Sequence, residues 1–293
     1  MMSSLMYRRD FTKMALCAAV ASPLAANPDS KIRGVRVGAQ TYSFRDRPLD
    51  DAIKALSSIG ISYVELWQGH IEPKKETPPE ELKKWRTAPE TLVEMKGVRK
   101  KFAQAGIRIY ALNYSFRKSH TDEEVLHGMA MAKALGTKYI TASSTVDQAA
   151  RLNELAKKAG VNVAMHNHSN LKDPNEYATP ESFAKAMEGH SNILINLDIG
   201  HFTAANFDAV DYLQKHHDHI VTLHIKDRKK NQGDNVPFGE GDTPIKEVLQ
   251  LLRDRKWSIP AMIEYEYKGK DSVEEVRKCY EYCKRALTDT AAA

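Results

Sequence analysis

Four short apolar runs in this sequence are each followed by a residue that can bind a metal ion. The residues in question are His166, His168, Asp198, His224 and Glu264. When successive parallel strands deliver aspartate, histidine and glutamate to one rim of a barrel, the side chains form a pocket for a divalent cation. The pattern therefore predicts a metalloenzyme.

Each of these residue types also has an ordinary structural role that competes with metal binding. Asp198 would serve as a helix cap or turn residue, and His224 would serve as a hydrogen-bonded core histidine. Glu264 is harder to explain in this way, because a buried carboxylate needs a cation or hydrogen-bond donors beside it. We interpret all three as ligands and keep the structural roles as alternatives.

The alternation of side chains along a strand places the candidate residues on one face. Residues two apart point the same way, so His166 shares a face with His168, and His224 shares one with Lys226. Polar residues on the inward face of barrel strands are costly unless they bind something. Their concentration in the last four predicted strands indicates a binding site there.

Strand-like and helix-like segments alternate eight times along the chain. Strands are expected near 35–42, 63–67, 108–113, 139–143, 162–168, 193–198, 220–226 and 261–265. Helices are expected near 48–59, 80–105, 122–135, 146–159, 178–188, 206–217, 244–255 and 272–287. Eight such units predict an α/β fold, a (β/α)8 TIM barrel forming a single domain over 27–293. An open doubly wound sheet is the alternative, but no G-x-G-x-x-G turn follows the first strand.

Two other segments need an assignment within this barrel. The proline-containing stretch 68–89 is the longest loop after a strand, and it is either a solvated excursion or a lid over the site. The His-His-Asp-His run at 216–219 resembles a metal cluster. It falls between a helix and the next strand, on the opposite rim, so we expect a solvated turn.

Several sequence elements together resemble one barrel family. Besides the strand-end residues, they are Leu-Asp-x-Gly-His at 197–201, His-x-Lys-Asp at 224–227 and Pro-Phe-Gly-Glu-Gly-Asp at 237–242. From about residue 35 to the C-terminus, the chain resembles the xylose isomerase-like barrel superfamily of sugar isomerases and epimerases. The resemblance implies one divalent metal ion, often manganese, magnesium, cobalt or zinc, held by glutamate, aspartate, histidine and glutamate from strands five to eight.

The fifth strand departs from that pattern. His166 stands where the family has glutamate, and Met165-His166-Asn167-His168 resembles the histidine-bearing branch that includes inositol-pathway dehydratases. In the epimerases, the fifth- and eighth-strand glutamates act as paired proton donors and acceptors, so the loss of one disfavours symmetric two-base epimerisation. A histidine bound to a metal cannot act as the base. Either His166 binds the metal and His168 moves a proton, or the reverse holds.

The residues and the resemblance together predict a class of reaction. Two histidines and two carboxylates form a mixed nitrogen and oxygen site, which suits manganese, iron, cobalt or zinc better than calcium. Such a site stabilises the enediolate formed when a proton leaves the carbon next to a carbonyl. We predict a sugar isomerase or epimerase with His168, Glu264 and His166 as catalytic residues. A lyase or dehydratase acting on a keto-sugar, 3-keto-glycoside or keto-inositol is the alternative, and a metal-containing sugar-binding protein without turnover is a second one.

Further residues at strand ends and in the resembling motifs are predicted to contact a carbohydrate substrate. Sugars commonly stack on aromatic rings and hydrogen-bond to amides and carboxylates. Core packing is the alternative for those in strands, and Lys226 would hold a substrate oxygen or a phosphate. The predicted substrate contacts are Gln40, Glu65, Trp67, Asn113, His201, Lys226 and Glu240.

Composition restricts the class of partner. The chain has 293 residues, 42% of them hydrophobic and 28% charged, which is typical of a globular protein rather than a disordered one. The formal charge of +5 is too small to indicate nucleic-acid binding, and the first 26 residues contribute a net two of these charges. Small-molecule carbohydrate is the expected partner, and the sequence leaves a homo-oligomer open. Cys279 and Cys283 lie four residues apart on a predicted helix, where a disulfide would be strained, so we expect free thiols.

The N-terminus predicts export. Residues 7–13, Tyr-Arg-Arg-Asp-Phe-Thr-Lys, resemble the twin-arginine consensus and precede a short apolar run over 14–20. We expect a signal peptide over 1–26, cleaved near Ala26, and a periplasmic or secreted protein. The apolar run is shorter than the ~20 residues that span a bilayer, so no stable membrane insertion is expected after cleavage. An ordinary basic amphipathic N-terminus is the alternative.

Overall fold

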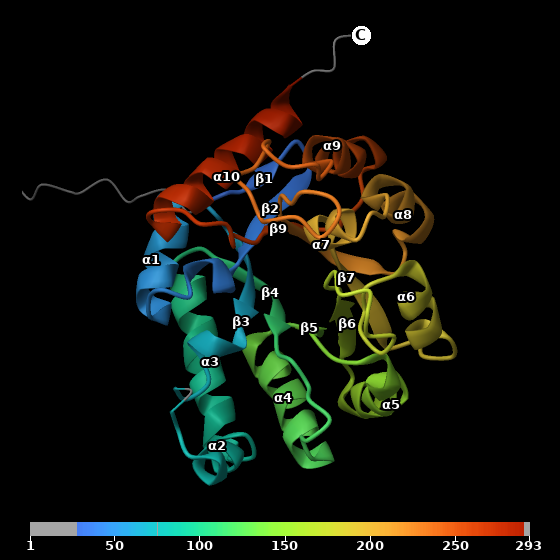
Figure 1. Cartoon of the computed structure of the whole chain (residues 1–293). Helices are drawn as coiled ribbons and strands as arrows, with labels where there is room; N and C mark the ends of the chain where they lie inside the picture. The colour runs from blue at the N-terminus through green and yellow to red at the C-terminus, as the bar shows by residue number, and fades with distance from the viewer. Residues whose placement is uncertain (1–27, 75, 290–293) are drawn as a thin grey trace, which may run out of the picture.

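Parallel strands close into a barrel in the computed structural model, which describes residues 28–74 and 76–289 (Figure 1). Neighbouring strands pair in chain order from β2 to β9, and β2 also pairs with β9, with Val37 opposite Ala261, so the barrel is closed. The predicted (β/α)8 barrel is confirmed. The predicted signal peptide lies outside the described residues.

The barrel strands agree closely with the predicted ranges. A short strand β1 (Lys31–Ile32) was not predicted, and it pairs antiparallel with β2. The barrel strands are β2 (Val35–Gln40), β3 (Tyr63–Trp67), β4 (Arg108–Asn113), β5 (Tyr139–Ala142), β6 (Asn162–His166), β7 (Ile193–Asp198), β8 (Ile220–Ile225) and β9 (Ala261–Ile263).

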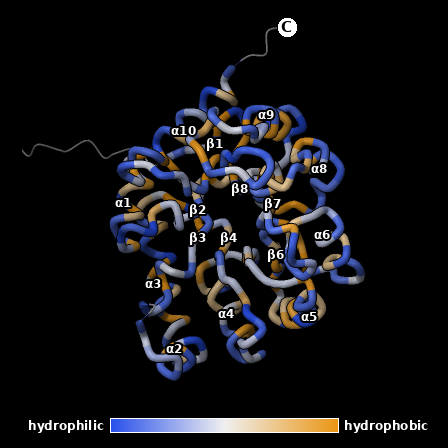
Figure 2. The backbone as a smooth tube through the Cα atoms, in the orientation of Figure 1, coloured by the Kyte–Doolittle hydropathy of each residue, from blue (hydrophilic) through white to orange (hydrophobic). Residues whose placement is uncertain are grey.

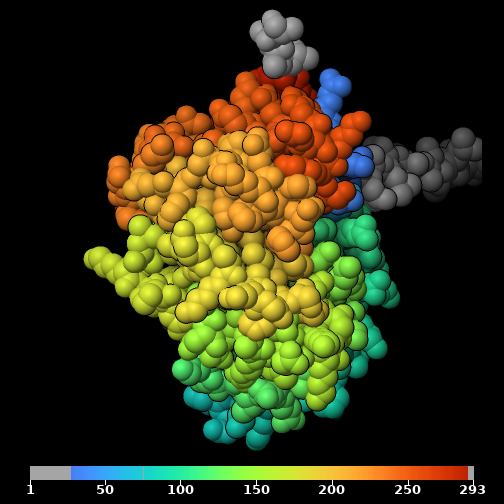
Figure 3. All heavy atoms as spheres, turned by 90° about the vertical axis from the view of Figure 1, so that its right-hand side faces the viewer, coloured from blue at the N-terminus to red at the C-terminus, as the bar shows by residue number. Residues whose placement is uncertain are grey.

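Helices surround the strands as a ring, and Figure 2 shows hydrophobic residues alternating with hydrophilic ones along them. In α1, for example, Ala52, Leu56 and Ile59 are buried against the barrel while its acidic first turn faces solvent. The helices are α1 (Leu49–Ile59), α2 (Pro79–Trp85), α3 (Pro89–Gln104), α4 (Asp122–Leu135), α5 (Ala149–Ala159), α6 (Pro180–Met187), α7 (Ile199–Ala204), α8 (Ala209–His216), α9 (Ile245–Arg255) and α10 (Ser272–Thr288). Seen from the side, consecutive segments stack in chain order into a closely packed wall (Figure 3).

Two helix predictions need correction, and one further helix was not predicted. The single helix predicted over 80–105 is two helices, because Ala88 precedes Pro89 and adopts extended backbone angles that the following proline ring favours. The helix predicted from residue 206 begins only at Ala209, because the Asp208 side chain caps it by accepting the N–H groups of Val210 and Asp211. The six-residue α7 was not predicted.

The two rims of the barrel differ in what they carry. The histidine-rich run over 216–219 forms the turn between α8 and β8, where the His217 ring stacks on Trp257 with centroids 4.2 Å apart, as expected for a segment outside the site. In the 68–89 stretch, Glu72 pairs with Arg86 at 3.0 Å. Figure 1 places α2 at the periphery beside α3, so this helix does not cover the barrel axis.

Two further observations concern the described residues. No helix among them is both long and apolar enough to cross a membrane. Cys279 and Cys283 are both buried free thiols on α10, as predicted.

Candidate metal centre

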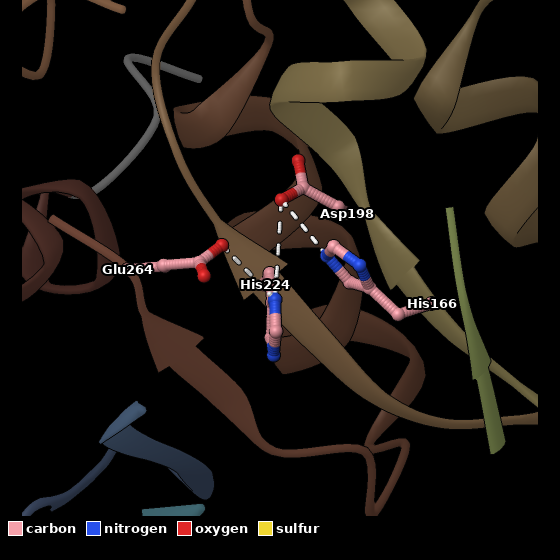
Figure 4. Close-up of side chains that lie close together, drawn as sticks. All are labelled: His166, Asp198, His224 and Glu264. Atoms are coloured by element: carbon pink, nitrogen blue, oxygen red, sulfur yellow. Dashed lines mark hydrogen bonds and ion pairs between the residues drawn. The ribbon is translucent and has the colours of Figure 1, made fainter. Parts of the chain in front are cut away.

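Four side chains from four neighbouring strands converge at the carboxyl-terminal rim of the barrel (Figure 4). His166 ends β6, Asp198 ends β7, His224 lies near the end of β8, and Glu264 directly follows β9. One ligand atom of each lies within 4.8 Å of the others, and all four residues are buried. His168, the alternative ligand on the fifth strand, is not part of this cluster.

The register of the strands explains the convergence. Asp198 lies directly opposite His224, and His166 lies opposite Asn196, the residue two before Asp198. His224 in turn lies opposite Met262, so Glu264 continues the same face one step further along. Local alternation and parallel pairing together therefore bring the four side chains to one point.

Two potential ligand atoms in the cluster are buried without a hydrogen bond. The His166 Nε2 atom lies 3.4 Å from Asp198 Oδ2, and the His224 Nδ1 atom lies 3.1 Å from Glu264 Oε2. Among the described residues, His224 Nδ1 and Glu264 Oε2 are both buried and make no hydrogen bond, and Glu264 Oε2 is held by its ion pair with Lys226 Nζ at 2.8 Å. Leaving such an atom unsatisfied costs about 1–3 kcal/mol. A cation bound between these atoms would remove that cost, so the donor set fits a metal ion.

The charge balance of the site also favours a bound cation. Asp198, Glu264 and Glu65 are buried carboxylates, while Lys226 contributes one buried ammonium. With neutral histidines, these four groups carry a net charge of about −2. Buried charge of this kind is costly unless it is compensated. A divalent cation would balance the charge, and the two nitrogen and two oxygen donors suit a transition metal.

Lys226 lies on the carboxylate side of the cluster and is only 2% exposed. Its Nζ atom is 3.2 Å from Asp198 Oδ2, 2.8 Å from Glu264 Oε2 and 2.6 Å from Glu266 Oε2. Burial alone would lower the pKa of Lys226, but these carboxylates raise it, so the amine is charged. Burial would likewise raise the pKa of Asp198, but Lys226 and His201 hold it well below its ordinary value.

Glu65 orients His224 from the opposite side of the barrel. Its Oε1 atom accepts hydrogen bonds from Thr141 Oγ1 at 2.7 Å and Gln40 Nε2 at 3.2 Å, and lies 2.9 Å from His224 Nε2. A proton on His224 Nε2 donated to Glu65 leaves Nδ1 free to bind a metal, which is the usual role of a carboxylate behind a ligating histidine. Burial opposes protonation, yet Glu65 and Glu264 raise the pKa of His224 well above its ordinary value, so a metal ion that binds there would displace the proton from Nδ1. Glu65 is fully buried and Gln40 is 4% exposed, and their contact with substrate stays a prediction.

His168 lies beside the cluster, where solvent can reach it. Its side chain is 38% exposed, its Nδ1 atom is 2.8 Å from Glu176 Oε1, and its ring centroid is 4.9 Å from that of His166. Burial, together with the neighbouring His166 and Lys226, lowers the pKa of His168 to about 4. Glu176 was not predicted, because it lies in the irregular loop after β6, where no periodic pattern marks it.

The other predicted substrate contacts fall into three settings. His201 is half-buried between Lys226 Nζ at 3.1 Å and Arg228 at 2.7 Å, beside the cluster. Trp67 is half-buried and packs edge-on against Tyr42 at the end of β3, whereas Asn113 is buried and hydrogen-bonded to Thr141. Glu240 is exposed in the glycine-rich loop, which the sequence pattern had singled out.

The buried Asp227 fixes that glycine-rich loop. Its carboxylate accepts the backbone N–H groups of Gly239 and Gly241, at 2.8 and 3.0 Å. A Cβ atom at Gly241 would lie only 1.8 Å from Asp227 Oδ1, which explains the glycine. Burial raises the pKa of Asp227. The His-x-Lys-Asp element thus carries a candidate metal ligand, a buried ammonium and a loop anchor within four residues.

Comparison with known proteins agrees with this architecture. Residues 53–285 match the family model described as xylose isomerase-like TIM barrel. L-ribulose-5-phosphate 3-epimerase UlaE of Escherichia coli is 31% identical over 141 residues, which cover 46% of this chain and 47% of the relative. The matched region therefore spans about half the length of that relative.

Two solved structures share the fold over most of the chain. A protein of uncharacterised function from Parabacteroides distasonis is 26% identical, with a TM-score of 0.61, over 86% of this chain and 99% of its own. The probable 3-DHS dehydratase AsbF of Bacillus anthracis is 18% identical, with a TM-score of 0.64, over 84% of this chain and 98% of its own.

Proposed function

This chain belongs to the xylose isomerase-like TIM barrel family, and from that premise we propose that it is a divalent-metal-dependent enzyme acting on a carbohydrate. The reaction moves a proton from the carbon next to a carbonyl, as in sugar isomerisation and epimerisation. The observation that carries the proposal is the convergence of His166, Asp198, His224 and Glu264, whose potential ligand atoms all lie within 4.8 Å of one another.

The ligand set supports manganese, cobalt, zinc, iron or magnesium as the ion. A divalent cation held by these four side chains would act as a Lewis acid that stabilises negative charge on the carbonyl oxygen. Lys226 holds the carboxylates of Asp198 and Glu264 from one side, and Glu65 holds His224 from the other. These contacts fix the ligands in orientation before a substrate arrives.

His168 is the group best placed to move the proton. Its Nδ1 atom lies 2.8 Å from Glu176 Oε1, and with the proton on Nδ1 the Nε2 atom is the acceptor, in the manner of a histidine oriented by a carboxylate. His168 takes the proton from the substrate carbon, and the electron pair of the broken C–H bond shifts toward the carbonyl oxygen. Return of a proton to the former carbonyl carbon, with the proton of the adjacent hydroxyl passing to the former carbonyl oxygen, completes an isomerisation. Return to the same carbon from the opposite face completes an epimerisation.

A solvent-exchange experiment tests this function. Purified, manganese-loaded protein is incubated in D2O with a panel of ketoses and keto-sugars, and deuterium at the carbons next to the carbonyl is followed by NMR. We expect wash-in that requires the metal and falls at least a hundredfold in His168→Gln. Bound metal in this variant should match wild type. Failure of every sugar to exchange would favour a binding protein without turnover.

A lyase or dehydratase acting on a keto-sugar, 3-keto-glycoside or keto-inositol is the second candidate. The observation that favours it is His166 at the end of β6, the fifth strand of the barrel. A glutamate at this position would supply a second acid-base group on the opposite face of the substrate. With a single free base, the electron pair of the C–H bond can instead form a C=C bond while a group leaves the adjacent carbon with a proton. Mass spectrometry separates the outcomes: isomers keep the substrate mass, whereas elimination gives an unsaturated product and a released group.

We further propose that residues 1–26 export the protein through the twin-arginine route. The support is the order of Arg8, Arg9, Phe11 and Lys13 before an apolar run. Fusion of residues 1–30 to a reporter should give a periplasmic signal that is lost when Arg8→Lys and Arg9→Lys are combined. A signal that survives the double substitution would contradict export by this route.

A further inference from the structure

A cavity of about 470 Å³ lies on the same rim as the metal cluster and includes His168 in its wall. Its other lining residues come from the loops after β4, β5 and β6, among them Lys118, Ser143 and Asp147. Its volume falls within the range of about 300–1,000 Å³ that is common for small-molecule sites. The cavity therefore extends the site outward from His168, away from the four ligands.

The loops that form this cavity are joined to each other. The backbone N–H of Val146 donates to the carbonyl of Asn175 at 2.8 Å, and that of Asp147 donates to the Asn175 side chain at 2.9 Å. Thr145 and Glu176 also form an isolated antiparallel bridge. These hydrogen bonds fix the loops after β5 and β6 relative to one another. The cavity is thus pre-formed, which lowers the entropic cost of binding a ligand there.

The charges in the cavity favour an uncharged ligand over an anionic one. Two basic residues, Arg117 and Lys118, face three acidic ones, Asp147, Asp173 and Glu176. Lys118 lies 3.4 Å from Asp147, so its charge is already paired. Phosphate is bound most strongly by charge-assisted bonds from basic groups, and here the acidic groups outnumber the basic ones. An uncharged polyhydroxyl ligand suits this mixture of carboxylates, hydroxyls and one amide.

We infer that the substrate carries a second, uncharged sugar unit, which this cavity binds while the reacting carbons lie at the metal cluster. His168 joins the two parts, because it lines the cavity and its ring lies 4.9 Å from that of His166. Ser143, directly after β5, offers a half-buried hydroxyl at the cavity wall. The inference rests on the proposed function and narrows its substrate to a glycoside or disaccharide that contains a keto-sugar.

Equilibrium binding tests the inference without requiring turnover. Manganese-loaded protein is titrated calorimetrically with D-fructose, D-fructose 6-phosphate and four glucosyl-fructoses that differ in linkage: turanose, maltulose, leucrose and isomaltulose. We expect at least one disaccharide to bind at least tenfold more tightly than D-fructose. Disaccharides that all bind no better than D-fructose, or bind more weakly than D-fructose 6-phosphate, would overturn the inference.

Filling the cavity locates the effect. Ser143→Trp at the wall and Lys118→Trp at an exposed position should each bring the ratio of the affinities for the disaccharide and for D-fructose close to one. Glu247→Trp is the matched control, because Glu247 is exposed and lines a different cavity beside α8 and α9. A preference that survives both cavity substitutions would place the second sugar elsewhere and overturn the inference.

Deuterium exchange on the same probes separates this inference from the proposed function. Exchange with D-fructose but no preference for any disaccharide would leave the enzyme proposal standing and remove the second sugar site. A binding preference for a disaccharide without deuterium exchange of any probe would keep the second sugar site and contradict the proposed enzyme activity.

Discussion

The two halves of the barrel interior use the same residue types in opposite ways. On the β6–β9 side, the four side chains of the candidate metal centre each bring one potential ligand atom within 4.8 Å of the others. On the β2–β5 side, Glu65 Oε1 is contacted by Thr141, Gln40 and His224. The difference teaches that one half presents atoms for a cation, while the other half holds those atoms in place.

The largest expected effect comes from removing a ligand on the β6–β9 side. Asp198→Asn keeps the size of the side chain but removes a charge and weakens its ligand oxygen. We expect bound metal, measured by elemental analysis, to fall below about a tenth of wild type, with activity lost in parallel. Asp218→Asn is the control, because Asp218 is exposed on the opposite rim. If Asp198→Asn kept the wild-type metal content, the β6–β9 side would not be the half that provides the metal ligands.

Removing the buried ammonium on the same side should be nearly as severe. Lys226→Met leaves the carboxylates of Asp198 and Glu264 without their buried partner. Because breaking a buried ion pair costs about 3–5 kcal/mol, the metal-free variant should lose that much free energy of unfolding in urea. Added manganese should recover part of it, whereas the exposed control Lys215→Met should change little. A metal-free variant as stable as wild type would show that the carboxylates do not depend on Lys226.

Sequence reasoning located the ligand side of this comparison and missed most of the supporting side. The strand ranges 63–67, 108–113 and 193–198 match the structure, because strands buried on both faces appear in a sequence as short apolar runs, along which side chains alternate in direction. That alternation, with strand ends meeting on one rim, was enough to bring Asp198, His224 and Glu264 together.

Contacts between distant segments carry no such pattern. Glu65 and His224 are 159 residues apart, and only the closed barrel places them 2.9 Å from each other. The pairing of His168 with Glu176 depends on the path of an irregular loop. The choice between His166 and His168 as ligand was also open in the sequence, because both were predicted on the same face of one strand. In the structure β6 ends at His166, and the candidate metal cluster includes His166 and not His168.

A substitution on the β2–β5 side should weaken the metal site without destroying it. Glu65→Gln removes the charge that orients His224 but keeps a hydrogen-bonding side chain. Since supporting residues of this kind usually contribute 10–100-fold to metal affinity, we expect a loss of about that size in competition with a chelating dye. The exposed Glu247→Gln serves as the control. A loss as complete as that of Asp198→Asn would mean that Glu65 is itself a ligand.

The smallest effect should come from a residue on the β2–β5 side that contacts Glu65 and none of the candidate ligands. Thr141→Val removes the hydroxyl that donates to Glu65 Oε1 at 2.7 Å, with little change in shape. A lost hydrogen bond to a charged group is worth about 1.5–3 kcal/mol, and only part of this should reach the metal. We expect metal affinity to fall by about tenfold or less, measured with the same dye. A larger loss than in Glu65→Gln would contradict the order of the supporting contacts.

The central claim is that one divalent ion binds between His166, Asp198, His224 and Glu264. The most direct measurement is an anomalous difference map from crystals grown with manganese and collected above and below the metal absorption edge. We predict a single strong peak at the carboxyl-terminal rim, at coordination distance from His224 Nδ1 and from a carboxylate oxygen of both Asp198 and Glu264. A peak at the 216–219 turn, or no peak among these four side chains, would contradict the account.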